Sequence, residues 1–534
     1  MRYGHPAAGA DSRFAEPVPD MVKQFVVYFY RHIRERNVRE IHTMYDTSFA
    51  KLSERFYKTS SWPPVDAVAD LVDQDHVFCL LYKEMYFRHL YAVAQPSLEQ
   101  RAESWDNYCS LFNVVLHGNV NMQLPNAWLW DMVDEFIYQF QSFAQYRGRL
   151  QNKAPEELQM LRKCASAGVW DVLSVLNYLQ ALIDKSGVVK ELSTEGGAQR
   201  FNETEGYEQH SSNVLPMVGY FSLVGLLRVH SLFGDYHGAL KALAPINPFV
   251  TKHLFTPKIA GCNITLYYYG GFCYLMQRRY LDAAKAFNLV LSYIARVKQY
   301  HARSAQYDQI LKKNEQIYAL LAITTALCPA ANNLLDENIL NALQEKSADK
   351  ISKMKNGSEN AFEDLFSYAC PKFVTAAPPS LDNPNINTNQ EAYRLQLRCF
   401  LGLIHEQRHL PTLKQFLKLY TSISLPKLAS LMELDEATVR GQLLVLKAAS
   451  FCKTWSGTGD ATEGTVHAAA DVDFYIDINE AGTELVHVSD TKVVRRQGEF
   501  LARHISKFAD IVRDLNTPEL PNVPLAPAPM TATY

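Results

Sequence analysis

Three carboxylates in one helical segment have a spacing that acid–base chemistry could use. Asp131, Asp134 and Glu135 stand at positions i, i+3 and i+4, so a helix would carry them on one face. A pair of carboxyl groups acts as general acid and general base only when their surroundings push the two pKa values apart. The three residues also follow closely on Asn126, where the predicted helix begins and where its dipole favours negative charge. We favour this structural interpretation over catalysis.

The other patterns that could carry chemistry are weaker. The chain has no Walker loop, no nucleophile elbow, no H-E-x-x-H pair and no dinucleotide fingerprint. The glycine-rich stretch GTGDATEG lacks the Lys-Ser or Lys-Thr pair that would hold a phosphate, so we interpret the insertion at 457–469 as a flexible loop. None of the histidines pairs with Cys or Asp at metal-ligand spacing. We therefore expect no enzyme activity, no cofactor, no metal and no small-molecule substrate.

Composition indicates a folded protein from a reducing compartment. Of the 534 residues, 48% are hydrophobic and 20% are charged, which is enough to bury a core and excludes a largely disordered chain. The nine cysteines are scattered and form no C-x-x-C pair, which argues against a disulfide framework or a zinc cluster. The N-terminus lacks the apolar core of a signal peptide. We expect a cytoplasmic protein without membrane contact.

The elements that would position any site are overwhelmingly helical. Apolar residues recur at spacings of three and four from the first predicted helix onward, as in Val22, Phe25, Val26, Phe29 and Ile33. Two helical hairpins in the middle of the chain place small and aromatic residues at the offsets of a tetratricopeptide repeat, among them Gly271, Tyr274, Ala283 and Phe287. The pattern predicts a mainly α fold, an α-solenoid of degenerate TPR-like helical repeats.

A different pattern follows the solenoid. A short helix over 427–432, a turn with Asp435 as N-cap and a helix over 436–449 precede two candidate strands, 472–478 and 484–488. Helix, turn, helix and β-hairpin together describe a winged-helix domain.

The predicted organisation has two domains between two disordered tails. Its parts are an N-terminal tail (1–17), a helical solenoid with TPR-like hairpins (18–304), a second domain (305–513) made of a helical part (305–420), a winged helix (421–490) and a C-terminal helix (492–515), and a Pro-rich tail (516–534).

Charge argues against nucleic-acid binding by the winged helix. The net charge of the whole chain is −3, and acidic residues outnumber basic ones from residue 412 onward. The helix that would enter a major groove offers only Arg440 and Lys447, whereas specific binders contact many phosphates. We expect any RNA contact to be indirect or weak and the domain to bind proteins.

Two apolar features predict a subunit interface. In the first candidate strand, apolar residues alternate with aspartates, and a strand at a sheet edge can pair with the same element of a neighbouring subunit. On the last helix, an apolar stripe could pack on the chain's own solenoid or in a partner's bundle. The candidate interface residues are Val472, Phe474, Ile476, Phe500, Leu501, Ile505 and Phe508.

A solenoid capped by a winged helix and a terminal helix resembles the PCI domain, a module shared by the proteasome lid, the COP9 signalosome and translation initiation factor 3. The segments PSLEQRAESWDNYCSLFN (96–113), WLWDMVDEFIYQFQSF (128–143) and GYFSLVGLLRVHSLFGDY (219–236) are similar to those of a PCI subunit family of eukaryotic translation initiation factor 3. The similarity extends from about residue 20 to residue 513.

The resemblance implies a non-catalytic scaffold subunit of that initiation factor. The complex binds the small ribosomal subunit and promotes recruitment of mRNA and initiator tRNA, and subunits K and E are the expected neighbours. The winged helix would join the PCI scaffold, and the terminal helix would enter a shared helical bundle. The alternatives are a PCI scaffold subunit of the proteasome lid or signalosome type and a direct RNA-binding protein.

Overall fold

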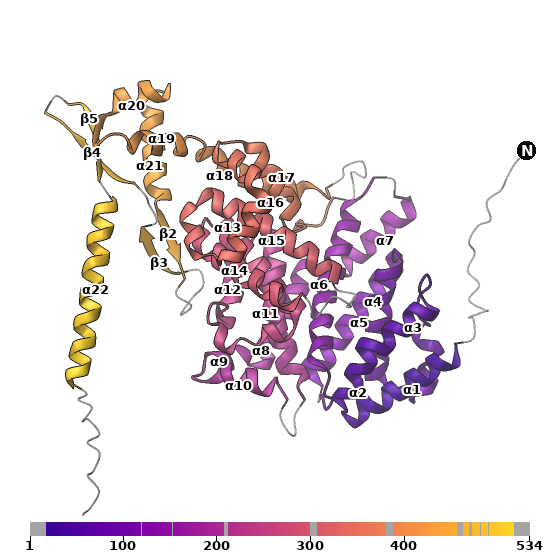
Figure 1. Ribbon diagram of the computed structural model, residues 1–534. Helices are drawn as coiled ribbons and strands as arrows, with labels where there is room; N and C mark the ends of the chain where they lie inside the picture. Colours follow the sequence, from indigo (N-terminus) through magenta and orange to yellow (C-terminus); the bar gives the residue numbers. More distant parts are fainter. Residues whose placement is uncertain are drawn as a thin grey trace, which may run out of the picture. The chain divides into compact units, whose positions relative to one another are not determined.

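The chain folds into two compact units in the computed structural model (Figure 1). The described residues are 18–516 except 119, 152, 208–211, 299–306, 381–387, 456–462, 469–471, 481 and 490. The first unit holds the described part of Met1–His405 and Cys452–His467, and the second holds that of Glu406–Phe451 and Ala468–Tyr534. The predicted tails, apart from residue 516, and most of the predicted insertion lie outside the described residues.

Helices build the first unit, as the apolar periodicity predicts. Its first nine are α1 (Asp20–Glu35), α2 (Val38–Thr43), α3 (Phe49–Phe56), α4 (His76–Val93), α5 (Leu98–His117), α6 (Asn126–Gly148), α7 (Pro155–Ser166), α8 (Val172–Ser186) and α9 (Val188–Ser193). The others are α10 (Gly197–Thr204), α11 (Val214–Phe233), α12 (Tyr236–Leu243), α13 (Ala260–Met276), α14 (Tyr280–Val297), α15 (Tyr307–Leu327), α16 (Glu337–Lys355), α17 (Glu359–Ala369) and α18 (Glu391–Glu406). Helices adjacent in sequence pack together, including α4 with α5 and α13 with α14, which is consistent with a helical solenoid.

Local sequence sets where these helices begin and end. At the start of α5, the Gln100 N–H donates to the Ser97 hydroxyl, and the Ser97 N–H donates to the Gln100 side chain at 2.9 Å. Asp171 caps the start of α8, and its carboxylate accepts two backbone N–H groups. Gly187, in the left-handed conformation, caps the end of the helix.

Helix α11 lies at the centre of the first unit. By length and composition, it is the one helix in the described parts of the chain that could cross a membrane. Its side chains are buried on all sides, and it packs against α6, α8, α12 and α13. A helix that is apolar all round and covered by other helices is typical of a protein core.

The small and aromatic residues of the predicted repeat pack together in α13 and α14. A Cβ added to Gly271 would overlap the fully buried ring of Phe287. Close approach of the two helices at this point therefore requires glycine.

Replacing Gly271 with alanine should destabilise the first unit. Overpacking of a filled core costs about 1–3 kcal/mol. The matched control is Gly402→Ala in α18, where an added Cβ meets nothing within 4 Å. That change should instead stabilise by about 0.5–1 kcal/mol, because alanine favours the helix. Urea unfolding followed by circular dichroism measures both, and a Gly271→Ala chain at least as stable as wild type would contradict this packing.

The second unit combines short helices with a small sheet. Its elements are α19 (Leu410–Leu417), β1 (Ser422–Ser424), α20 (Leu425–Met432), α21 (Glu436–Ala449), β4 (Asp473–Ile478), β5 (Glu484–Ser489) and α22 (Thr491–Asn516). The strands pair in the order β1-β5-β4, both pairs antiparallel, with Phe474 opposite Val488 and Ile476 opposite Val486. The two predicted strands are present, and the three-residue β1 is an addition that the sequence pattern did not indicate.

Candidate subunit interface

The apolar residues of β4 face the core of their own unit. Val472 is 7% and Phe474 is 5% exposed, and the partly buried Ile476 packs against the same cluster. The exposed side chains of the strand are those of Asp473, Tyr475 and Asp477 and the end residue Ile478. Val472 and Phe474 therefore pack within their own unit, because in a half-buried strand the apolar positions of a two-residue period mark the core face. Pairing of this edge strand with a neighbouring subunit stays a prediction.

The edge of the sheet at β4 already has side-chain partners. The Phe474 N–H donates to the Asp473 carboxylate at 2.9 Å, and the Ile478 N–H donates to that of Asp477 at 2.8 Å. Lys447 Nζ donates to the Phe474 carbonyl at 2.9 Å. Charged side chains over an edge strand hinder pairing with another strand. A partner strand would have to displace these contacts.

The two cations of α21 are engaged within the second unit. Arg440 forms two hydrogen bonds to Glu484, one of them from Nε at 3.0 Å, and Lys447 pairs with Asp473. The hydrogen bond from Lys447 holds the pKa of Asp473 below its usual value. Arg440 and Lys447 are the two cations with which α21 could contact nucleic acid. Because both are paired with carboxylates, phosphate binding by this helix is disfavoured.

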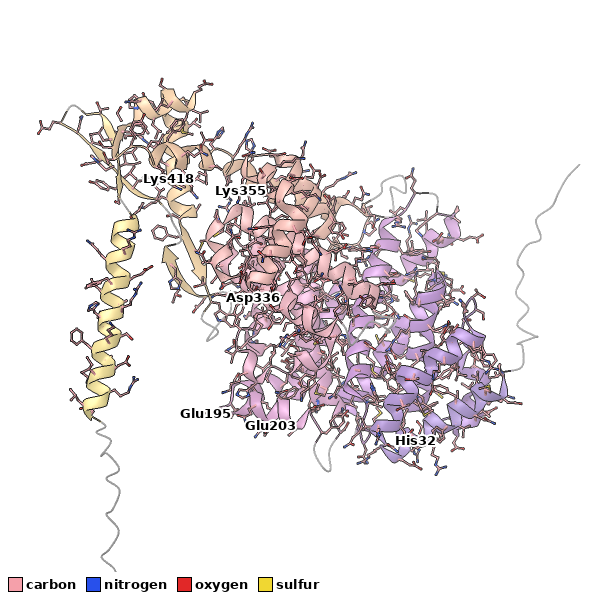
Figure 2. All side chains as sticks on the ribbon, viewed as in Figure 1. His32, Glu195, Glu203, Asp336, Lys355 and Lys418 are labelled. Atoms are coloured by element: carbon pink, nitrogen blue, oxygen red, sulfur yellow. The ribbon has the colours of Figure 1, made fainter. Side chains whose placement is uncertain are left out.

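Helix α22 carries the other predicted interface residues, and all of them are exposed. The exposed fraction is 59% for Phe500, 59% for Leu501, 68% for Ile505 and 64% for Phe508. The stripe continues through three more exposed apolar side chains, Ile511, Val512 and Leu515. Figure 2 shows side chains projecting from α22 along its length.

The stripe has the spacing of a coiled-coil seam. Leu501, Ile505, Phe508, Val512 and Leu515 follow one another at alternating steps of four and three, as positions a and d of a heptad do. Opposite charges such as Arg503 and Glu499, 3.5 Å apart, lie off the seam. This face can be buried against the apolar face of another helix.

Two of the three carboxylates of α6 are held by partners from outside that helix, and the third by a residue of α6 itself. Asp131 accepts the Tyr45 hydroxyl at 2.6 Å and lies 3.6 Å from Arg88. Asp134 pairs with Arg228 of α11, and the third carboxylate, Glu135, accepts Gln139 Nε2 at 2.9 Å. Pairing with other elements, rather than the helix dipole that the sequence suggested, accounts for Asp131 and Asp134, whereas Glu135 is held by the next turn of its own helix.

Burial raises the pKa of Asp131 and of Glu135 to about 7, an effect that Arg88 opposes at both residues. Both pKa values move in the same direction because both carboxyl groups lose water on burial. The contacts of Asp131, Asp134 and Glu135 support a structural role for these three carboxylates.

A fourth carboxylate, Glu84 of α4, is fully buried, and no local sequence pattern marks it. It accepts Trp128 Nε1 at 3.0 Å and the Tyr108 hydroxyl at 3.4 Å, and it pairs with Arg88. Burial raises its pKa well above the usual value. Glu84 is a hydrogen-bonding centre of the core, where it joins α4, α5 and α6.

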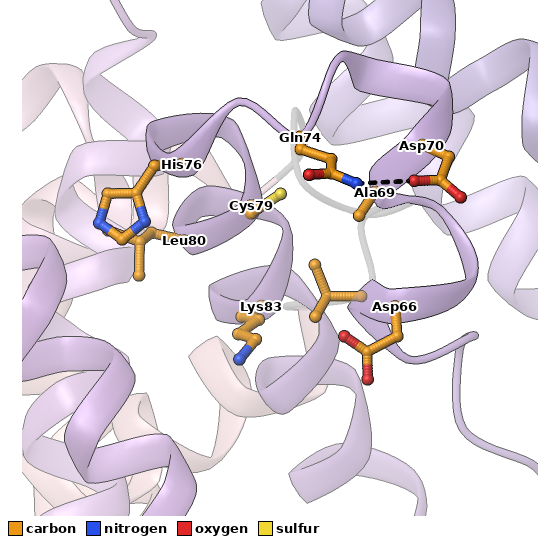
Figure 3. A pocket seen from close by; sticks show the side chains of 9 residues that line it. Asp66, Ala69, Asp70, Gln74, His76, Cys79, Leu80 and Lys83 are labelled. Atoms are coloured by element: carbon orange, nitrogen blue, oxygen red, sulfur yellow. Dashed lines mark hydrogen bonds between the residues drawn. The ribbon is translucent and has the colours of Figure 1, made fainter.

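A surface pocket of about 400 Å³ lies beside the start of α4 (Figure 3). Its walls include Asp66, His76, Cys79 and Lys83. Across the described ranges, no group of three or more His, Cys, Asp or Glu residues is placed to hold a metal ion. The pocket is lined by a mixture of polar and apolar side chains, and it is not the candidate site.

Comparison with known proteins adds an independent line of argument. A family model described as RNA polymerase I-associated factor PAF67 matches residues 100–508. A Nematostella vectensis protein named eukaryotic translation initiation factor 3 subunit L is 43% identical over 515 residues, which cover 96% of each chain. The Xenopus laevis and Homo sapiens proteins of the same name are each 42% identical over 525 residues, 93% of this chain and 91% and 90% of theirs.

Proposed function

The chain belongs to the eukaryotic translation initiation factor 3 subunit L family, and we propose that it serves translation initiation as a non-catalytic scaffold subunit of that factor. In this role it joins other subunits of the factor in the cytoplasm. The assembled complex binds the small ribosomal subunit and promotes recruitment of mRNA and initiator tRNA.

The observation that carries this proposal is the exposed seam of α22. Burying a Val, Leu, Ile or Phe side chain stabilises an assembly by about 1.5–3 kcal/mol, so a helix with seven such side chains exposed, five of them on the seam, is a strong site for association. Ala502 and Ala509 flank the seam at the same heptad position. Small residues there let helices approach from more than one side, as in a helical bundle. The seam favours a bundle made with helices of neighbouring subunits.

We assign the second unit to the winged-helix part of a PCI domain. Two helices, α20 and α21, joined by a turn that Asp435 caps, and the β4–β5 hairpin support this assignment. The proposed PCI domain over 305–513 would also include α15 to α18 of the first unit. Subunits K and E are the proposed neighbours.

Affinity purification of the tagged chain from cytosol, before and after ribonuclease treatment, tests the proposal. We expect other subunits of initiation factor 3 to remain bound after the nuclease, because the contacts are apolar helix faces. Recovery of proteasome lid or signalosome subunits in their place would keep the fold and overturn the assignment. Loss of every partner with the RNA would instead favour direct RNA binding, which the paired Arg440 and Lys447 disfavour.

A further inference from the structure

A short hairpin from the C-terminal part of the sequence belongs to the first unit. Cys452–His467 lies in that unit, although the residues on both sides of it in the sequence belong to the second unit. Its strands are β2 (Phe451–Thr454) and β3 (Thr465–Ala468), which pair with each other. A Cβ at Gly464 would overlap the Thr454 carbonyl, so the close approach of the two strands here requires glycine.

Trp455, directly after β2, is buried in the first unit. It is 3% exposed, and among the described residues it is the one member of that unit's hydrophobic core from beyond Ile404. Its ring meets the ring of Phe249 with centroids 5.9 Å apart, and Phe249 in turn stacks on Tyr274 of α13. The tryptophan thus completes an aromatic cluster that the repeat helices begin.

The backbone beside this ring is bound as well. The Trp455 N–H donates to Asp282 Oδ2 at 3.0 Å, and the Asp282 side chain is fully buried near the start of α14. Arg279 donates to the same oxygen from Nε at 3.0 Å and from a terminal nitrogen at 2.7 Å. Buried charge is tolerated where a paired cation and further donors satisfy it, and here the hairpin supplies one of those donors.

We propose that Phe249, Tyr274, Arg279 and Asp282 form a binding site for an extended segment of this chain, Thr454–Trp455, and that this docking holds strands β2 and β3 on the first unit. The Phe249 ring contacts the Trp455 side chain, and the Asp282 carboxylate accepts the Trp455 backbone N–H. Binding sites for extended peptides commonly combine side-chain and backbone contacts in this way. The connection between α21 and β4 is thereby anchored midway. The inference rests on contacts within the first unit and is independent of the proposed role in translation.

Native-state proteolysis of the full chain tests the anchor. Trypsin cuts after Lys453 only when β2 leaves β3 and the first unit, so the cleavage rate reports local opening. We expect Trp455→Ala to raise the rate of cleavage at Lys453–Thr454 at least tenfold, and Trp455→Phe to raise it less. The matched control is Val466→Ala on β3, a side chain that is 65% exposed, and it should stay within twofold of wild type. A Trp455→Ala rate equal to that of the control would overturn the proposal.

Hydrogen exchange of the wild-type chain gives a second readout, which holds even if Trp455→Ala fails to fold. The Trp455 amide donates to a buried carboxylate and should exchange far more slowly than an exposed amide. Exchange of that amide at the rate of an unstructured peptide would overturn the proposal, and slow exchange would support it.

Discussion

Replacing both Leu501 and Ile505 with aspartate should abolish recovery of other initiation factor 3 subunits with the tagged chain. Both side chains are more than half exposed, so the change should leave the folding of the chain itself unaltered. In the assembly, each apolar side chain contributes about 1.5–3 kcal/mol by burial. Losing both therefore weakens association at least about a hundredfold, since about 1.4 kcal/mol is a factor of ten in Kd.

The control for this change carries the same aspartates on the polar side of α22. Arg503→Asp with Lys507→Asp alters charge off the apolar seam and should leave most subunit recovery intact. Quantitative mass spectrometry of the purified assemblies compares the two variants, and circular dichroism of each isolated chain checks its fold. Unchanged recovery with Leu501→Asp and Ile505→Asp would remove α22 from the interface.

The helices could be predicted from sequence because each carries its own signal. The apolar residues of α22 recur with helical period, and its bounds of Thr491–Asn516 differ from the expected 492–515 by one residue at each end. The predicted apolar stripe is present on this helix and exposed, and its role as a subunit interface stays a prediction. The turn before α21 is equally local, because Asp435 accepts the Thr438 N–H three residues away.

Which face of β4 is buried could not be predicted from its local sequence in the same way. Alternation separates the two faces of a strand, and only the unit that packs on one face decides which side is buried. Asp473 and Asp477 on the alternate positions were the available signal, because aspartate seldom enters a core unpaired. That signal puts Phe474 inside the unit, as the structure does.

Contacts distant in sequence account for the remaining features that were not predicted. Trp455 binds Asp282 across 173 residues, and the glycine-rich stretch beside it suggested only a loop. The buried Glu84 carboxylate is stabilised by Trp128, 44 residues away, whose indole N–H donates to it. No local pattern marks either pair, since a buried carboxylate is stable only where the fold brings donors to it.

Replacing Phe474 with aspartate should unfold the second unit, which separates a folding role for this residue from an interface role. The side chain is 5% exposed and belongs to the cluster that includes Leu413, Val439 and Leu443. Loss of a buried phenylalanine costs about 3–5 kcal/mol before any charge is buried, and a small unit has only about 5–15 kcal/mol to lose. Tyr475→Asp, next in sequence but 58% exposed, should cost less than about 1 kcal/mol.

Hydrogen exchange resolved by peptide distinguishes the two outcomes. With Phe474→Asp, protection should disappear from α20, α21 and β5 and persist in α11 and α13, because those helices belong to the other compact unit. With Tyr475→Asp, protection should match wild type throughout. Any loss of subunit recovery in the Phe474→Asp chain then reports unfolding, whereas loss in the Tyr475→Asp chain would report a contact on the outer face of the sheet. Wild-type protection of the second unit in the Phe474→Asp chain would contradict the placement of this side chain in the core.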